Sequence, residues 1–373
     1  MKFTVQLNNQ PYIEFTKVTF SRSIDVNVGQ FSLDGTYKSD SPQALAGDNI
    51  KIFFDGKIAF TGVIDKISIK SSRDGTSVTY SGRDLLCDAV DSSVPDSVKV
   101  QKGEISLKSI CEKHLKSLGL ELKVVDKTKE KVGNKPVRKQ ETNDGQKMLH
   151  QLSKYAATYQ SWLVADEESN LTIMRAGEID LDCPFYYLKS GNGKNNILDA
   201  SLDVDTTQIF SKVKVRGKGS IAFDVSTQST DDVVDISGSF YDDDARPTRY
   251  LEIKLADTVT AQTAKKRAID EVNMRKAKAF DYRIETNFFN TRDGGMIKIG
   301  GVCMVEDEIR NVSGRMIIRA FDVTFDREGG TSTSLSFAPP EAYSIVDIED
   351  IPPQKTKKKR HLKVHDKRYQ EKE

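Results

Sequence analysis

The chain has 373 residues, of which 37% are hydrophobic and 30% charged, and its formal net charge is +1. This composition is typical of a globular protein with two to four domains. No apolar run approaches the roughly 18 residues that cross a bilayer, and residues 1–7 alternate like a strand and lack the apolar core of a signal peptide. We therefore expect a protein that folds in a cytoplasm and has no membrane-spanning segment.

Residues 1–93 show the two-residue hydrophobic period of β-strands that have one buried face. The dipeptides Asp34-Gly35, Asp55-Gly56 and Asp74-Gly75 predict tight turns, because Asp and Gly accept the backbone angles of hairpins. Short strands separated by such turns predict a first small β-barrel over residues 1–93.

Residues 94–193 have the pattern of an inserted α+β domain. Ser106 is the predicted N-cap of a first helix and Gly119 its end, and a second helix is expected from about Asp144. Two apolar segments at 162–164 and 171–173 predict a hairpin. Its tryptophan, Trp162, could stack on a ligand, but core packing is the favoured interpretation.

Part of the first β-domain recurs later in the chain. Residues 15–20 resemble 210–215, and the series from Gly47 through Ile64-Asp65 to 75–81 resembles the series from Gly301 through Phe321-Asp322 to 330–337. Because a repeat predicts architecture, we assign residues 194–217 and 280–343 to a second small β-barrel. Two such domains would offer two similar surfaces to a symmetric partner.

An insertion with a long helix is expected between residues 218 and 279, inside the second β-domain. Thr258 or Thr260 is the predicted cap of this helix, and Glu271 and Arg275 are expected to pair on its exposed side. The acidic run at 242–244 could bind a cation. A solvated loop is the better interpretation, because no further carboxylates stand at coordinating spacing.

The C-terminal residues 344–373 are predicted to form an extended basic arm. Between Gln354 and Glu373 there are nine Lys or Arg and three Asp or Glu, so this end carries +6 and the other 353 residues carry −5. An arm that orders on a neighbouring subunit or acidic partner and a solvated flexible end are both open interpretations. The candidate partner-binding residues are Lys355, Lys357, Lys358, Lys359, Arg360, Lys363, Lys367 and Arg368.

No group of residues has the spacing of a reactive site. The four cysteines lie far apart and are predicted to be reduced core residues, and the four histidines lack partners at metal-ligand spacing. A nucleophile elbow, a P-loop and a dinucleotide fingerprint are also missing from the sequence. We therefore expect no metal, no cofactor and no enzymatic activity.

A strand in the first β-domain ends in Ser81-Gly82-Arg83, and a short helical segment with Asp84, Val90 and Asp91 follows before the pair Ser92-Ser93. Together with residues 59–65, this pattern resembles the hub proteins of contractile phage tails, in particular the Mu-type baseplate hub and late control D family. The strand at 212–217 and the later alanine-rich helix fit the second half of that family. The resemblance covers most of residues 1–343 and excludes the basic tail.

The resemblance implies a mainly β protein with two tail-tube-like barrels, α+β insertions and a structural role in the tail baseplate of a virion, assembled in the host cytoplasm. Three chains would form a homotrimeric, pseudo-sixfold ring that docks the sixfold tail tube on one side and the threefold central spike on the other. Tape-measure protein and other baseplate proteins are further candidate partners. DNA would pass through the lumen only in transit, during ejection.

Two other functions are compatible with the sequence. A nucleic-acid-binding protein could use small barrels and the basic tail, although the body is acidic and the tail lacks interleaved aromatic residues. A cell-wall hydrolase fused to a hub is a third hypothesis, but neither inserted region offers a plausible pair of catalytic carboxylates.

Overall fold

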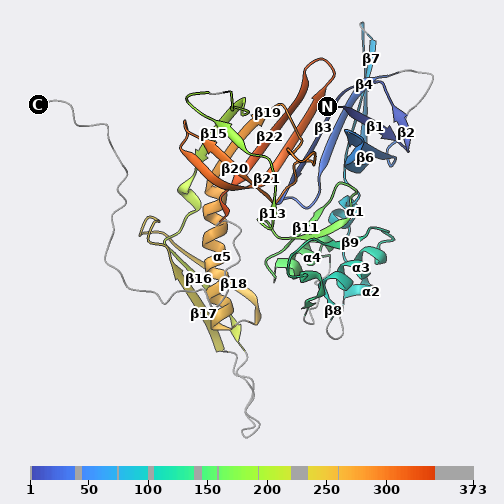
Figure 1. Ribbon diagram of the computed structural model, residues 1–373. Coiled ribbons are helices and arrows are strands. Elements are labelled where there is room, and N and C mark those ends of the chain that lie inside the picture. Colours follow the sequence, from blue (N-terminus) through green and yellow to red (C-terminus); the bar gives the residue numbers. More distant parts are fainter. Residues whose placement is uncertain are drawn as a thin grey trace, which may run out of the picture. The chain divides into compact units, whose positions relative to one another are not determined.

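The computed structural model of the chain (Figure 1) describes residues 2–37, 44–73, 75–99, 105–137, 145–157, 159–191, 193–219, 234–258 and 260–340. These residues belong to two compact units. The first unit combines 1–202 with 282–340, and the described part of the second unit is 203–281. None of the described helices has both the length and the apolar character needed to cross a membrane.

The first unit is built on a 14-stranded sheet, which confirms the prediction of a mainly β fold with α+β insertions. Its first seven strands are β1 (Phe3–Leu7), β2 (Gln10–Tyr12), β3 (Phe15–Ser23), β4 (Gln30–Thr36), β5 (Asn49–Phe54), β6 (Lys57–Ser72) and β7 (Gly75–Arg83). The remaining strands are β13 (Ile179–Asp180), β14 (Phe185–Tyr187), β15 (Asp199–Val204), β19 (Phe280–Thr286), β20 (Gly301–Asp307), β21 (Val312–Asp326) and β22 (Gly330–Ala338).

The strands are ordered β15-β19-β22-β21-β3-β4-β7-β6-β5-β1-β2, and β20 joins β21 to the short parallel strands β13 and β14. Two small β-barrels were expected, but among the described strands no pairing closes this ladder into a barrel. The two β-domains are therefore joined edge to edge in one sheet.

Two of the predicted turns can be compared with the structure. Asp55 and Gly56 form the β5–β6 turn with φ angles of +46° and +81°, as expected for a tight hairpin. The turn predicted at Asp34-Gly35 is wrong, because both residues lie inside β4. Glycine is needed at position 35 for a different reason: a Cβ there would overlap the hydroxyl of Tyr12.

The α+β insert follows β7. Its elements are α1 (Cys87–Asp91), α2 (Asp96–Lys99), β8 (Ile105–Ser106), α3 (Leu107–Ser117), β9 (Val124–Asp126), η1 (Val132–Asn134), β10 (Pro136–Val137), α4 (Met148–Ala157), β11 (Trp162–Ala165) and β12 (Leu171–Met174). The helices α1, α3 and α4 share one hydrophobic core with the β9, β11 and β12 strands.

Local signals placed the insert's elements well. The Ser106 hydroxyl accepts the Ser109 N–H at 3.2 Å, and Gly119 has a φ of +76° just after α3. The β11–β12 hairpin pairs as predicted. α4 begins at Met148, later than the predicted start at Asp144, a residue outside the described ranges. Trp162 is half-buried and does not lie in the centre of the core.

The second unit packs one helix on a small sheet (Figure 1). Its elements are η2 (Thr206–Gln208), β16 (Lys212–Gly219), β17 (Val234–Tyr241), β18 (Tyr250–Thr258) and α5 (Ala261–Ala279), and the strand order is β17-β16-β18. Ala264 and Ala268 of α5 pack on Val213 and Val215 of β16. Thr260 caps α5 through a capping box with Thr263, which confirms one of the two predicted caps.

Two acidic residues of the second unit are buried, contrary to expectation. Glu271 pairs with Arg275 at 2.8 Å as predicted, but only 6% of Glu271 is exposed, because its carboxylate lies under the two arginines of α5 that flank it. Asp242 was expected in a solvated acidic loop. It is instead 7% exposed and binds Lys276 at 2.8 Å, which fixes the end of β17 to the helix.

Candidate assembly interface

The two β-domains meet where β3 pairs antiparallel with β21, and we call this pairing the internal junction. It runs from Lys17 opposite Asp326 to Ser23 opposite Ala320. On the core face Phe20 lies opposite Val323, and both are buried. On the other face the hydroxyls of Thr19 and Thr324 lie 3.1 Å apart. The junction is therefore a complete strand pairing, with an apolar face and a hydrogen-bonded polar face.

The hairpins β6–β7 and β21–β22 are copies of one another at the level of the backbone. The register of β6 on β7 shifts between Ile64 and Lys66, and that of β21 on β22 shifts between Ile318 and Ala320. The Gly47 N–H donates to the Ile64 carbonyl at 2.8 Å, and the Gly300 N–H donates to the Ile318 carbonyl at 2.7 Å. Both glycines have positive φ, at +95° and +73°. Ile64 is thus equivalent to Ile318, and the predicted repeat is real.

The structure corrects the alignment of the repeat. Gly47 corresponds to Gly300, where the sequence comparison chose Gly301, and Ile64-Asp65 corresponds to Ile318-Arg319, where it chose Phe321-Asp322. The reason is that the bulge and the glycine hydrogen bond, and not the side chains, define the equivalent positions.

The counterpart of β3 is β15 and not the strand at 212–217. β4 lies beside β7 as β19 lies beside β22, and the outer neighbours of β4 and β19 are β3 and β15. The predicted counterpart is β16, which pairs with β17 and β18 in the separate three-stranded sheet. We call β3–β7 the first copy and β15 with β19–β22 the second copy.

Two strand edges of the 14-stranded sheet correspond to the halves of the internal junction. Residues 320–325 of β21 pair with β3, whereas the equivalent part of β6, residues 66–71, pairs with β7 alone among the described strands. β15 likewise pairs only with β19 among them. Large apolar side chains are exposed on both edges: Ile69 on β6 is 52% exposed and Val204 on β15 is 62% exposed. We call these the β6 edge and the β15 edge.

The motif Gly82-Arg83-Asp84 joins the first copy to the α+β insert. A Cβ on Gly82 would overlap the carbonyl oxygen of Val63, so the bulged hairpin needs glycine there. Arg83 bridges Asp65 at 2.8 Å, on the bulge, and Asp91 at 2.9 Å, at the end of α1. This motif therefore has a structural reason in the present chain.

Asp84 continues the motif into the protein interior. Its buried carboxylate accepts the N–H groups of Gly29 at 2.5 Å and Leu86 at 3.1 Å and lies 3.8 Å from the Arg22 guanidinium. Burial raises the pKa of Asp84 to about 6 despite the nearby arginine, and burial lowers the pKa of Arg22. Because desolvation dominates both shifts, this pair is a costly internal contact.

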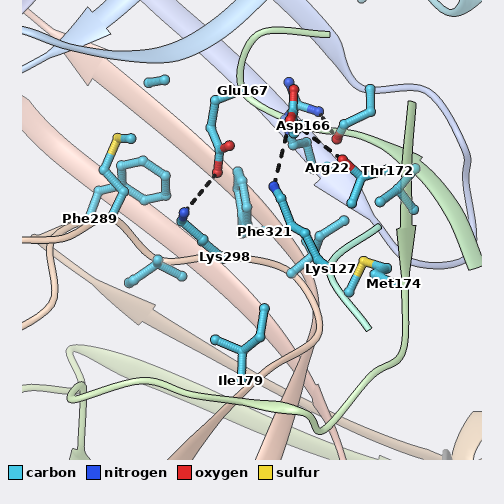
Figure 2. Close-up of a pocket in the computed structure, with 16 residues that line it drawn as sticks. Arg22, Lys127, Asp166, Glu167, Thr172, Met174, Ile179, Phe289, Lys298 and Phe321 are labelled. Atoms are coloured by element: carbon cyan, nitrogen blue, oxygen red, sulfur yellow. Dashed lines mark hydrogen bonds and ion pairs between the residues drawn. The ribbon is translucent and has the colours of Figure 1, made fainter. Parts of the chain in front are cut away.

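Arg22 also lines a cavity of about 120 Å³ (Figure 2). Arg22 donates to the Ala165 carbonyl of β11 and stacks over Phe60 at 5.0 Å. Lys127 with Asp166 and Lys298 with Glu167 form ion pairs at the rim, at 3.6 and 3.7 Å. The rest of the lining is largely apolar, and these two lysines and two carboxylates are paired with one another. Its polar contacts fasten the insert to the β-domains.

The second unit has a cluster of cationic and aromatic side chains, with Glu252 among them, that was not evident from the sequence. On the side of β16 opposite α5, the Lys212 ammonium lies 5.2 Å from the ring centre of Tyr241 and 5.5 Å from that of Tyr250. The two tyrosines are 48% and 49% exposed. Lys214 and Arg216 follow Lys212 on the same face. Tyr241 and Tyr250 lie on the two strands that flank β16, each opposite Lys212, so strand pairing brings them together around one lysine.

The predicted arm, from Lys355 to Arg368, lies outside the described residues. Of the two described histidines, His150 is exposed on α4, whereas His114 is buried on α3. The Nδ1 atom of His114 lies 2.8 Å from the Ile110 carbonyl oxygen, and burial lowers the pKa of this histidine. All four cysteines are free and buried, in agreement with their predicted role as core residues. Within the described ranges, His, Cys, Asp and Glu residues form no cluster of three or more suited to a metal ion.

Comparison with known proteins identifies the first copy. Residues 2–84 match the family model of the N-terminal domain of the Mu phage baseplate assembly protein GpP-like family. This match confirms the resemblance to Mu-type baseplate proteins on the segment that contains β1–β7. A search of the curated proteins found no significant match.

Solved structures share the fold of nearly the whole chain. The 43 kDa tail protein of prophage MuSo2 from Shewanella oneidensis is 22% identical, with a TM-score of 0.77, and the match covers 91% of this chain and 99% of that one. A tail protein from Neisseria meningitidis MC58 is 17% identical, with a TM-score of 0.78 over 91% and 97% of the two chains. The Escherichia coli c3393 protein, a type VI secretion component described as similar to phage T4 tail proteins gp27 and gp5, is 9% identical, with a TM-score of 0.51 over 91% and 77%. The chain therefore has a phage-tail protein fold.

Proposed function

Because residues 2–84 carry the N-terminal domain of Mu phage baseplate assembly proteins of the GpP-like family, we propose that the chain is a structural, non-enzymatic baseplate hub of a contractile tail. In this role it acts within the virion, after assembly in the host cytoplasm. The fold shared with prophage tail proteins supports the proposal over almost the full described length.

The observation that carries the proposal is the duplicated hairpin. The two copies place the same bulge and the same glycine hydrogen bond at equivalent positions. A chain with two near-equivalent copies of one β-unit can present six similar surfaces when three chains assemble. A homotrimeric ring of this kind would match a sixfold tail tube on one side and a threefold central spike on the other.

The acidic body is compatible with a ring through which DNA or a tape-measure protein passes. Without the 20 C-terminal residues the chain carries −5. A negative lumen would not hold the phosphate backbone, whereas a basic lumen would bind it and slow its passage.

The test is the mass of the purified protein in solution, measured by light scattering over a range of concentrations with and without the spike protein. We expect a species near three times 41.7 kDa that the spike protein stabilises. A chain that stays monomeric at every concentration, alone and with the spike protein, would contradict the hub.

A second candidate, a nucleic-acid-binding protein, gains support from one feature of the second unit. The lysine between two half-exposed tyrosines combines a phosphate-binding charge with stacking surfaces. Oligonucleotide binding that weakens steeply with salt and is lost in Lys212→Ala would favour this function. If the protein binds oligonucleotides only weakly and Lys212→Ala does not change that binding, the structural role is the one that stands.

A further inference from the structure

We propose that neighbouring chains join by pairing the β6 edge of one chain with the β15 edge of the next chain. The inference rests on the proposed ring and names the strands that close it. Its template is the internal junction, where the second copy already accepts the outer strand of the first. The first copy has the same acceptor in β6, and the second copy has the same outer strand in β15.

The internal junction fixes the register. Val323 lies opposite Phe20, and Val323 is equivalent to Ile69, because the two residues lie opposite Thr333 and Val78 at matching positions of the hairpins. Phe20 is equivalent to Leu202 on β15. The proposed pairing therefore sets Ile69 of one chain opposite Leu202 of the next chain, with the strands antiparallel.

The equivalence of β15 and β3 follows from their contacts with the neighbouring strand. Lys17 lies opposite Asp34 just after a register shift, and Glu285 occupies the position of Asp34 on β19. The Leu198 N–H donates to the Glu285 carbonyl at 2.8 Å, which places Asp199 at the position of Lys17. Three residues later, Leu202 takes the position of Phe20.

Side-chain chemistry on the two edges is complementary in this register. On the core-facing side, Ile67 and Ile69 of β6 meet Val204 and Leu202 of β15, so the exposed Ile69 and Val204 would become covered.

Charges of opposite sign alternate along the outer side of the two strands. Lys66 and Lys70 on the β6 edge are exposed, and Asp199 and Asp203 on the β15 edge are exposed. In this register Lys70 lies opposite Ser201, so Asp199 and Asp203 are the diagonal neighbours of Lys70. Such cross-strand pairs favour one register over the alternatives.

The backbone gives a further reason for this pairing. An edge strand presents N–H and C=O groups that pair readily with another chain. The two edges are different surfaces of the same chain. An assembly of paired chains therefore keeps one β6 edge and one β15 edge open until a ring closes. Charged residues on both edges would discourage pairing of an edge with itself.

Disulfide cross-linking tests the register directly. The double variant Lys70→Cys with Ser201→Cys places thiols opposite one another on the exposed side of the two strands. The matched control, Lys70→Cys with Leu202→Cys, moves the second thiol by one residue to the other face. Native cysteines should not interfere, because all four are buried. Both variants are oxidised mildly and run on non-reducing gels, while light scattering gives the native mass.

The expected result is a covalent ladder that ends at three chains in the first variant, with at least a fivefold lower yield in the control. A trimer by native mass with no cross-link in either variant would overturn the pairing and leave the ring standing. Equal cross-linking in both variants would overturn the register. A monomer without cross-links would overturn the pairing and the proposed ring together.

Discussion

The two copies of the β-unit build the same backbone with differently placed aromatic side chains. In the first copy Phe60 on β6 packs against Phe31, with ring centres 5.7 Å apart. In the second copy Phe337 on β22 packs against Tyr282 at 5.9 Å. The position equivalent to Phe60 is Gly314, and the position equivalent to Phe337 is Gly82. Each core thus receives one aromatic ring from one strand and a glycine from the other.

The exchange teaches that the bulge fixes the geometry of the hairpin, whereas the core requires only that its volume be filled. It also explains why residue-by-residue similarity between the copies is weak. The copies differ again at their edges, since the acceptor strand of the second copy is occupied by β3 and that of the first is open among the described residues.

The strongest test of the comparison removes each aromatic ring. Phe60→Ala and Phe337→Ala should each lower the free energy of unfolding by about 3–5 kcal/mol, because both side chains are fully buried. Urea denaturation measures the loss, and Ile13→Ala, at a residue that is 73% exposed, is the control. A large loss in one copy and none in the other would show that the two rings do not have the same role.

The buried Asp84 gives the first copy a pH dependence. Its folded pKa of about 6 is above the value of an exposed carboxyl, so the folded state binds the proton more tightly. This contribution is present below about pH 4 and is lost as the pH rises through about 6. The unfolding free energy of the wild type minus that of Asp84→Asn should fall by roughly 2–3 kcal/mol between pH 4 and pH 7. A difference that stays constant or rises would contradict this environment for Asp84.

Gly82 in β7 should be less tolerant of a side chain than Gly329 in the β21–β22 turn. Gly82→Ala places a methyl group against the Val63 carbonyl and should cost about 1–3 kcal/mol of stability. Gly329→Ala is the matched control, because its new methyl would make only an ordinary contact with Asp326 at 3.6 Å. Thermal melts of the two variants compare them, and equal melting temperatures would argue against the close approach at the bulge.

The smallest expected effect concerns the open edge. Lys70→Glu would place a negative charge beside Asp199 and Asp203 of the neighbouring chain. It should weaken self-association about two- to fivefold, because a cross-strand charge pair contributes roughly 0.2–1 kcal/mol. The stability of the monomer should not change, since Lys70 is exposed. Lys116→Glu, on α3 of the insert, is the control for net charge. Light scattering across concentrations measures both, and an equal effect would remove the role of the edge.

Local chemistry predicted the elements that depend on neighbours in the chain. Ser106 and Thr260 were recognised as caps because their hydroxyls bond N–H groups three residues later. The Asp55-Gly56 turn was recognised because few residue pairs adopt two positive φ angles. The prediction of a turn at Asp34-Gly35 is wrong because the sequence around a glycine does not show why the glycine is needed. Gly35 lies in a strand and leaves room for Tyr12, but in the sequence it looks like a turn glycine.

The site was less predictable, because its parts are far apart in the sequence. The sequence around Arg22 does not predict its ion pair with Asp84. It also does not predict the hydrogen bond of Arg22 to Ala165, which is 143 residues away. The burial of Glu271 and Asp242 was missed because acidic residues are usually exposed and their cationic partners close over them only in the folded unit.

By itself the sequence determined that this protein is mainly β, that it contains a repeated hairpin and where its main helices are capped, since alternation, turns and caps act over a few residues. The tertiary structure decided which strands pair. Residues 199–204 and 212–217 both alternate as strands, yet only the first belongs to the repeated sheet. Local alternation specifies a face but not a partner, and partners are chosen by burial and register between segments that are far apart in the chain.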